Sequence, residues 1–429
     1  SVEQWGDIQW LSMHRAYAGT RNLEINTTDN PDLSSVNDMS YMFSDAGNFN
    51  QDLSSWNVSN VTDMSYMFSG AGIFNQDLSR WEVSNVTDMR YMFEGASAFN
   101  EDISSWNVSN VTNMRRMFLD ASSFNQELGN WDVSHVTDME FMFSDADAFN
   151  QDLSSWDLSH VITIRGMFQS ADVFNQDLSA WDVSNVTDMY RIFADAVSFN
   201  GELSAWDVSN VRSMLAMFFG ASAFNQDLSG WDVSNVTGMR SMFAEARNFN
   251  RDISSWNVSK VRDMSSMFSR AAVFNQELNS WDVSNVINMN YMFAGASAFN
   301  QDLSTWDVSN VTDMALMFYA ASAFNQDLSS WDVSSVTHMN FMFFGAKNFN
   351  QDLSSWDVSN VVIMSDMFKD ATLSTENYDA LLLGWSRLSL QENVTFSGGN
   401  SQYSSSSQDA RNVFTDLYGW TITDGGVDD

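Results

Sequence analysis

Hydrophobic positions recur along most of this chain with a period of 25 residues. Tryptophan occupies the same place in thirteen consecutive copies, from Trp56 to Trp356. Phenylalanine keeps this period from Phe49 to Phe349, and so does a Met-Phe pair that is Met67–Phe68 in the second copy. A fixed period of this length is typical of a solenoid, in which one supersecondary unit stacks on copies of itself.

The pattern inside one copy predicts a strand followed by a short helix. Residues 49–73 read FNQDLSSWNVSNVTDMSYMFSGAGI. Trp56 and Val58 lie two apart in a Leu-x-x-Trp-x-Val run, so on a strand both side chains point into the core. Further on, apolar residues at spacing i, i+3, i+4 and i+7 predict one face of a helix. These residues are Met64, Met67, Phe68 and Ala71.

We therefore predict an α/β fold, a leucine-rich-repeat-like right-handed solenoid of about 14 coils of strand plus short helix. Residues 1–30 are expected to form an N-terminal cap, residues 31–371 the solenoid, and residues 372–429 an α+β C-terminal cap. Within the last segment, residues 374–388 predict a helix, and residues 408–418 predict a second helical run. The apolar face expected on the first helix is Tyr378, Leu381, Leu382 and Trp385.

The formal net charge of −36 narrows the classes of partner. Such a chain is repelled by phosphate backbones and anionic headgroups, so we expect no nucleic-acid binding. No apolar run is long enough for membrane insertion. The charge leaves divalent cations, basic proteins and neutral glycans as candidate partners. The absence of cysteine excludes a disulfide framework and a thiol nucleophile.

Acidic residues form two columns of the repeat. One column begins at Asp52 and is acidic in every copy, and the other begins at Asn57 and holds Asp, Glu or Asn. Carboxylates stacked in this way could form a calcium ladder. Alternatively, each could bond backbone N–H groups in a tight Asx turn. The calcium candidates are Asp52, Asp77, Asp102, Asp132, Asp157 and Asp182, and no other cofactor is predicted.

A column of asparagines is equally regular. Asn50 and its equivalents are unchanged through the array. Because buried or stacked backbone groups need partners, we expect these side chains to form a hydrogen-bonded ladder between coils.

Aromatic residues gather at both ends of two variable columns. If these columns point outward, each end carries an apolar stripe of the kind that marks a contact site. The middle coils hold mostly small or charged residues at the first of these columns, such as Gly166, Ser241 and Ser266. Alternatively, the terminal segments fold back and cover the stripes. The stripe residues are Tyr41, Tyr66, Tyr91, Tyr291, Leu316, Tyr319, Phe341 and Phe344.

The repeat unit FNQDLSSWDVSNVTDMxxMFxxA resembles that of the BspA-like leucine-rich repeat surface proteins over roughly residues 33–371. The tail YDALLLGW…YGWTITDGG, from Tyr378 onward, resembles the segment that often follows such arrays. The resemblance implies an exported or cell-surface protein with a role in adhesion or protein interaction, and it brings no catalytic residues.

Two functions follow from these observations. The first is a non-enzymatic extracellular or cell-surface repeat protein that mediates adhesion or interaction with a protein or glycan. The second is a structural subunit that assembles with itself into an extracellular filament or surface layer. No histidine belongs to a Ser–His–Asp arrangement, and no carboxylate stands out from its column as an acid–base pair, so an enzyme is not expected.

Overall fold

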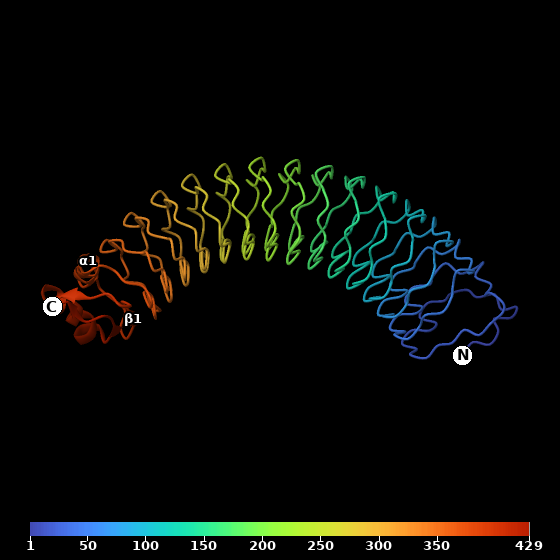
Figure 1. Ribbon diagram of the computed structural model, residues 1–429, viewed down its shortest axis with the longest axis horizontal. Coiled ribbons are helices and arrows are strands. Elements are labelled where there is room, and N and C mark those ends of the chain that lie inside the picture. Colours follow the sequence, from blue (N-terminus) through green and yellow to red (C-terminus); the bar gives the residue numbers. More distant parts are fainter. Residues whose placement is uncertain (429) are drawn as a thin grey trace. The chain divides into compact units, whose positions relative to one another are not determined.

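The computed structural model of the protein describes residues 1–428, and the chain divides into two compact units, Ser1–Val211 and Arg212–Asp429. Within each unit the chain winds through successive coils that lie side by side (Figure 1). The second unit ends in a small segment of helices and short strands, which includes α1 and β1.

Tight turns build each coil and link one buried residue to the next. In the coil of residues 49–73, the Trp56 N–H donates to the Leu53 carbonyl at 3.0 Å, and the Met67 N–H donates to the Met64 carbonyl at 3.2 Å. All four side chains are buried. The inward positions predicted from the sequence are therefore confirmed, while the backbone that presents them is different.

The predicted short helix is wrong. In residues 64–71 the φ angles of Tyr66 and Gly70 are 58° and 70°, whereas an α-helix needs negative φ throughout. The Tyr66 N–H donates to the Arg90 carbonyl and the Phe68 N–H to the Met92 carbonyl, both at 2.9 Å. These acceptors lie in the next coil rather than four residues back. We call residues 64–71 and their equivalents the ladder segment.

The ladder has a single direction. Alternate N–H groups of a ladder segment donate to the following coil, and alternate carbonyls accept from the preceding one, as Ser65 does from Tyr41 at 2.9 Å. The remaining amides close turns, such as Ala71 N–H to Phe68 carbonyl at 3.0 Å. Every alternate residue thus bonds across coils, which satisfies the backbone without a helix or a sheet.

The predicted strand is also wrong. The backbone from Leu53 to Val58 turns instead of running straight, since Trp56 bonds back to Leu53. Isolated parallel bridges between coils occur one residue before the ladder segment, for example between Asp63 and Asp88. Turns at every third residue reproduce the apolar spacing of a strand-plus-helix unit, and this explains the mistaken assignment.

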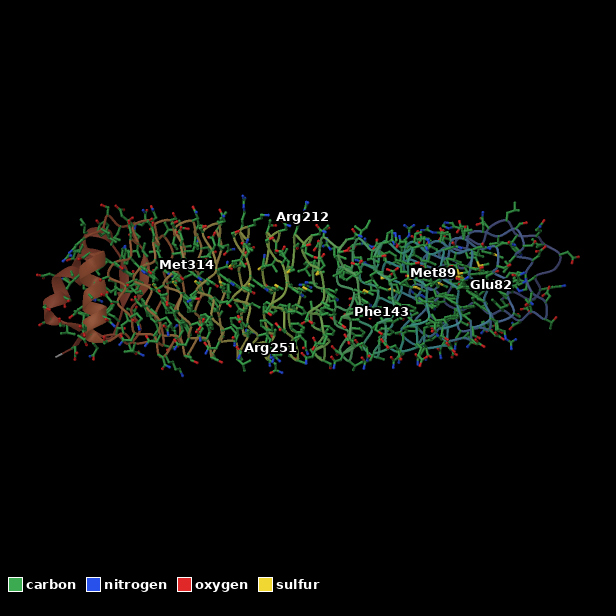
Figure 2. The ribbon with its side chains drawn as sticks, turned by 90° about the horizontal axis from the view of Figure 1, so that it is seen from above. Glu82, Met89, Phe143, Arg212, Arg251 and Met314 are labelled. Carbon is green, nitrogen blue, oxygen red and sulfur yellow. The ribbon has the colours of Figure 1, made fainter. Side chains whose placement is uncertain are left out.

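Stacked aromatic rings fill the interior. Trp106 and Trp131 are parallel, with centroids 6.4 Å apart, and the indole N–H of Trp106 donates to the Leu78 carbonyl at 3.0 Å. Trp106 therefore contributes apolar area and satisfies a carbonyl of the preceding coil, as Trp131 does with the Ile103 carbonyl at 3.2 Å. In the second unit Met314 lies inside the coils, whereas Arg212 and Arg251 reach opposite margins (Figure 2).

The predicted asparagine ladder is confirmed. The Asn75 N–H donates to Asn50 Oδ1 at 2.9 Å, and the Gln76 side-chain amide donates to the same oxygen at 2.8 Å. The Asn100 N–H likewise donates to Asn75 Oδ1, and the Asn125 N–H to Asn100 Oδ1, both at 2.8 Å, so these asparagines accept from the coil that follows.

The first residues of the chain join the ladder. Met13 N–H donates to the Asp38 carbonyl at 2.9 Å, and Arg15 N–H donates to the Ser40 carbonyl at 3.0 Å. Trp5 packs edge-on against Trp56 with centroids 5.5 Å apart. The segment expected to be a cap thus covers both the ladder and the tryptophan stack.

The C-terminal segment contains helices and two small parallel sheets. The predicted first helix is confirmed as α1, Thr375–Trp385, with Ser374 as N-cap and the expected four residues buried. The second helical run is η1 (Ser405–Ser407), α2 (Gln408–Asn412) and η2 (Val413–Leu417). Strand β1 (Thr395–Ser397) pairs with β3 (Thr421–Thr423), and β2 (Tyr403–Ser404) pairs with β4 (Val427–Asp428).

Side chains of the C-terminal segment donate the hydrogen bonds to the last coil that a further coil would otherwise donate. The Trp385 indole donates to the Leu353 carbonyl at 3.0 Å, as repeat tryptophans do. The Asn377 amide takes the place of a repeat glutamine and donates to Asn350 Oδ1 at 2.9 Å. Helix α1 therefore supplies, at the end of the stack, the hydrogen-bond donors that a further coil would supply.

We predict that Trp306→Ala lowers the free energy of unfolding by about 3–5 kcal/mol, because a large aromatic leaves a close-packed stack. Trp306 stacks on Trp331 at 6.4 Å, and its indole donates to the Leu278 carbonyl at 2.9 Å. Trp306→Phe keeps an aromatic ring in the stack, although the Leu278 carbonyl loses the indole donor. The free energy of unfolding should therefore fall by less than in Trp306→Ala. Denaturant titration checks both; equal losses would contradict the ring-packing explanation.

Candidate functional site

The ladder segment exposes the most variable surface of the coils. Met64, Met67, Phe68 and Ala71 are buried, whereas Tyr66 is partly exposed. Side chains at the positions of Ser65, Tyr66, Ser69 and Gly70 differ widely between coils. We call this surface the ladder face, and it contains every residue of the two predicted aromatic stripes.

In the first unit the aromatic column is filled by the chain itself. Tyr41, Tyr66 and Tyr91 stack with centroids 4.3 and 4.2 Å apart and planes within 10° of parallel. The guanidinium of Arg15 lies over Tyr41 at 4.7 Å, and that of Arg116 lies near Tyr91 at 5.5 Å. Cation–π contacts therefore close both ends of the tyrosine stack.

The column continues to Phe141, which ends it. Arg116 also lies over Phe141, at 5.1 Å. The Phe141 ring in turn covers Gly166, where an added Cβ would come within 2.2 Å of the ring. The N-terminal segment thus contributes Arg15 to one end of the stack, while Tyr41, Tyr66 and Tyr91 themselves stay partly exposed.

Burial and the neighbouring phenols raise the pKa of Tyr66 above its ordinary value. Desolvation is the main cause, because the ionised phenolate would lose water between two rings. The stack therefore favours neutral tyrosine, which fits a packed column.

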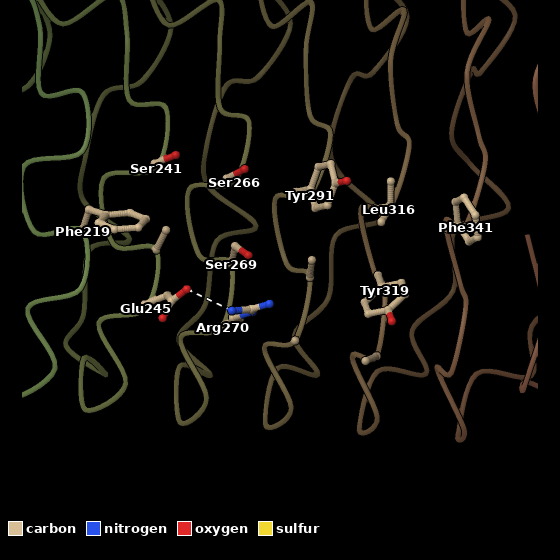
Figure 3. Close-up of a pocket in the computed structure, with 14 residues that line it drawn as sticks. Phe219, Ser241, Glu245, Ser266, Ser269, Arg270, Tyr291, Leu316, Tyr319 and Phe341 are labelled. Atoms are coloured by element: carbon tan, nitrogen blue, oxygen red, sulfur yellow. Dashed lines mark hydrogen bonds and ion pairs between the residues drawn. The ribbon is translucent and has the colours of Figure 1, made fainter. Parts of the chain in front are cut away.

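In the second unit the same column is empty at three coils. Ala216, Ser241 and Ser266 stand where the first unit has rings. A groove of about 650 Å³ runs over Ser241 and Ser266 (Figure 3). Its aromatic and aliphatic walls come from Phe219, Tyr291, Leu316, Tyr319 and Phe341.

An ion pair forms one lip of the groove. Arg270 Nη1 lies 3.0 Å from Glu245 Oε1, and the two residues come from adjacent coils (Figure 3). The Arg270 side chain is 69% exposed, so this pair contributes little to stability. Both charges remain accessible to a bound partner.

The structure brings together four of the five residues of the predicted second stripe. Tyr291, Leu316, Tyr319 and Phe341 all line the groove. The fifth residue, Phe344, stacks on Tyr319 at 4.9 Å and supports that wall from behind. Tyr291 is 42% exposed, which is unusual for a large apolar ring on this ladder face.

Comparison with known protein families identifies the repeat. The family described as "Mycoplasma protein of unknown function, DUF285" matches residues 11–128, 100–206, 197–306 and 272–381. The chain belongs to this family. Four overlapping matches in tandem agree with the repeated coils of the structure. Curated protein sequences give no match to this DUF285 protein.

Two solved structures show a distant similarity. A chain of the mouse RP105/MD-1 complex is 10% identical, with 93% of this chain and 70% of that chain covered and a TM-score of 0.21. A chain of the LRIM1/APL1C complex is also 10% identical, with 92% and 64% covered and a TM-score of 0.22. The DUF285 chain thus spans less than two thirds of the second, and such TM-scores carry no conclusion about function.

The acidic columns of the DUF285 chain have a structural role in turns. Each predicted calcium ligand accepts the N–H of a serine two residues further on, at 2.8–3.1 Å. These residues are Asp52, Asp77, Asp102, Asp132, Asp157 and Asp182. The Ser54 N–H and hydroxyl hold the pKa of Asp52 below its ordinary value. The Asx-turn interpretation is therefore confirmed.

A calcium ladder on these carboxylates stays a prediction. Within residues 1–428, no group of three or more His, Asp or Glu side chains converges as a metal site requires. Across the same residues, no helix is long and apolar enough to cross a membrane.

Sequence reasoning missed half of the groove. It singled out the rings of Tyr291 and Phe341 but treated Ser241 and Ser266 as an interruption of the stripe. The available signal was a run of small residues, from Ala216 to Ser266, in a column that aromatic residues fill in other coils. Sequence reasoning did not single out Glu245 and Arg270, because it placed their column near the end of the predicted helix.

We predict that Gly166→Ala lowers the free energy of unfolding by about 1–3 kcal/mol, because its methyl group must displace the Phe141 ring. Gly19→Ala is the matched control, since Gly19 also has a positive φ, 71° against 56° for Gly166, and a Cβ there meets nothing within 4 Å. Thermal unfolding of both variants provides the measurement. Equal stability of the two variants would mean that Phe141 does not close the column.

We also predict that Asp152→Asn combined with Asp302→Asn makes the protein less sensitive to acid. Serine N–H and hydroxyl groups lower the pKa of both carboxyls, so their stabilisation is present above the ordinary Asp pKa and is lost as pH falls through the folded pKa. Asparagine keeps the turn without titrating, as Asn57 does at 3.1 Å from the Ser59 N–H. The fall in the free energy of unfolding between about pH 7 and about pH 3, measured by denaturant titration at both, should be smaller in the variant than in the unmodified protein; an equal fall would contradict this role.

Proposed function

We propose that this protein is a non-enzymatic interaction protein that binds a macromolecular partner in the groove of its second unit. The groove supports this proposal because aromatic walls there surround an unfilled space of about 650 Å³. In the first unit, the equivalent column is closed by its own rings and guanidinium groups. An apolar recess that the chain leaves open is a typical contact site.

We further propose that the protein acts outside the cell or at its surface, in adhesion or in binding a protein or glycan. The support is the FNQDLSSWDVSNVTDM repeat, which resembles the repeat of BspA-like surface proteins. The net charge of −36 favours a basic or neutral partner over an anionic one.

Self-assembly through the groove is a second candidate, because Tyr291 is 42% exposed and a second copy could cover it. Head-to-tail addition of copies is disfavoured. The Phe368 N–H at the end of the ladder already donates to Ser397 of β1 at 3.0 Å, and Trp385 closes the tryptophan column. A filament would therefore need a lateral surface such as the groove rather than the C-terminal end of the ladder.

The test combines Tyr291→Ser, Leu316→Ser and Phe341→Ser in one variant. Ile287→Ser is the matched control, because Ile287 is 46% exposed but does not line the groove. Peptide and glycan arrays should give signals that fall at least about tenfold in the triple variant, the equivalent of about 1.4 kcal/mol, and persist in the control.

Light scattering over a concentration series distinguishes the second candidate. Growth in molar mass that disappears only in the triple variant would favour self-assembly. Identical array profiles and identical masses for all three proteins would contradict any contact function of the groove.

A further inference from the structure

We propose that the groove accepts a segment of a partner protein that carries arginine and aromatic side chains. These side chains would stack in the places that the chain fills by itself in the first unit. This inference rests on the proposed function and names the chemistry of its partner.

The first unit shows which groups fit such a column. From Arg15 to Phe141 its occupants are a guanidinium, three phenols, a second guanidinium and a phenyl ring. Consecutive rings lie 4.2–4.3 Å apart. Planar groups contributed once per coil therefore fill the column without gaps.

The empty positions have the same backbone as the filled ones. The φ angles of Ser241 and Ser266 are 56° and 57°, against 57° for Tyr41 and 58° for Tyr66. The Ser241 N–H donates to the Ser265 carbonyl at 2.9 Å, as the Tyr66 N–H does to Arg90. Only the rings are missing, so the groove has the shape of an unfilled stack.

The surroundings of the gap suit planar and cationic groups. Phe219 stands on one side of the serines, and Tyr291 and Tyr319 stand on the other (Figure 3). Offset stacking and cation–π contact with exposed rings both favour planar and cationic groups at such a site.

Charge also favours a cationic segment. Glu245 at the lip is 31% exposed, and its partners Arg247 and Arg270, at 3.7 and 3.0 Å, are both exposed and can be exchanged for a cation of the partner. The chain carries a net charge of −36, which attracts arginine over glutamate.

The groove is tested by filling it. Ser241→Tyr combined with Ser266→Tyr restores the pattern of the first unit on a backbone that already accepts tyrosine. The folded state should persist, which thermal unfolding checks, and net charge is unchanged. Tyr66→Ser in the first unit is the matched control outside the groove.

The probes are synthetic peptides of alternating arginine and tyrosine, with lysine–serine peptides of equal charge and glutamate–tyrosine peptides for comparison. A neutral oligosaccharide is included as well. Calorimetry on the full chain should show that the arginine–tyrosine peptide binds at least about tenfold more tightly than the others. The filled variant should lose this preference, and Tyr66→Ser should keep it.

Other results overturn the inference. Equal binding of the lysine–serine peptide, or full binding by the filled variant, would show attraction to the acidic surface alone. Oligosaccharide binding that is lost on filling, without peptide binding, would retain the groove as a contact site but reject this partner. No binding by any probe, or self-association that disappears on filling, would also reject it.

Discussion

The one-directional hydrogen bonds between ladder segments determine the rest of this structure. Two residues four apart in each ladder segment, such as Tyr66 and Gly70, have positive φ, and alternate N–H groups of the segment lie opposite carbonyls of the next coil. In an α-helix these N–H groups would instead donate to carbonyls four residues back in the same segment. The ladder can be long because every coil offers the same carbonyls in the same register.

This register also explains how one surface can be closed in the first unit and open in the second. Side chains in a column stand one coil apart, so like rings meet at stacking distance, as Tyr66 and Tyr91 do at 4.2 Å. Where serine replaces tyrosine, the backbone does not collapse because its hydrogen bonds are unchanged. A hollow such as the groove over Ser241 and Ser266 is the consequence.

The sequence predicted the residues of the core but not the path of the backbone. Turns that link each buried residue to the next one give Met64, Met67, Phe68 and Ala71 the same spacing as a helix face, so periodicity could not distinguish the two. Helix α1 was predictable because Ser374 caps an isolated amphipathic run with no repeat neighbour to compete. Only the aromatic walls of the groove could be predicted from the sequence. The small residues of its floor, Ser241 and Ser266, become informative only when they are compared with the filled column of the first unit.

Scalar couplings across hydrogen bonds, measured by NMR on isotopically labelled protein, test the ladder most directly. The structure predicts a coupling between the Phe68 amide nitrogen and the Met92 carbonyl carbon, which are joined by a 2.9 Å hydrogen bond. A coupling from Phe68 to the carbonyl of Met64 instead would indicate an α-helical turn. It would contradict the ladder, and with it the register that creates both the tyrosine column and the groove.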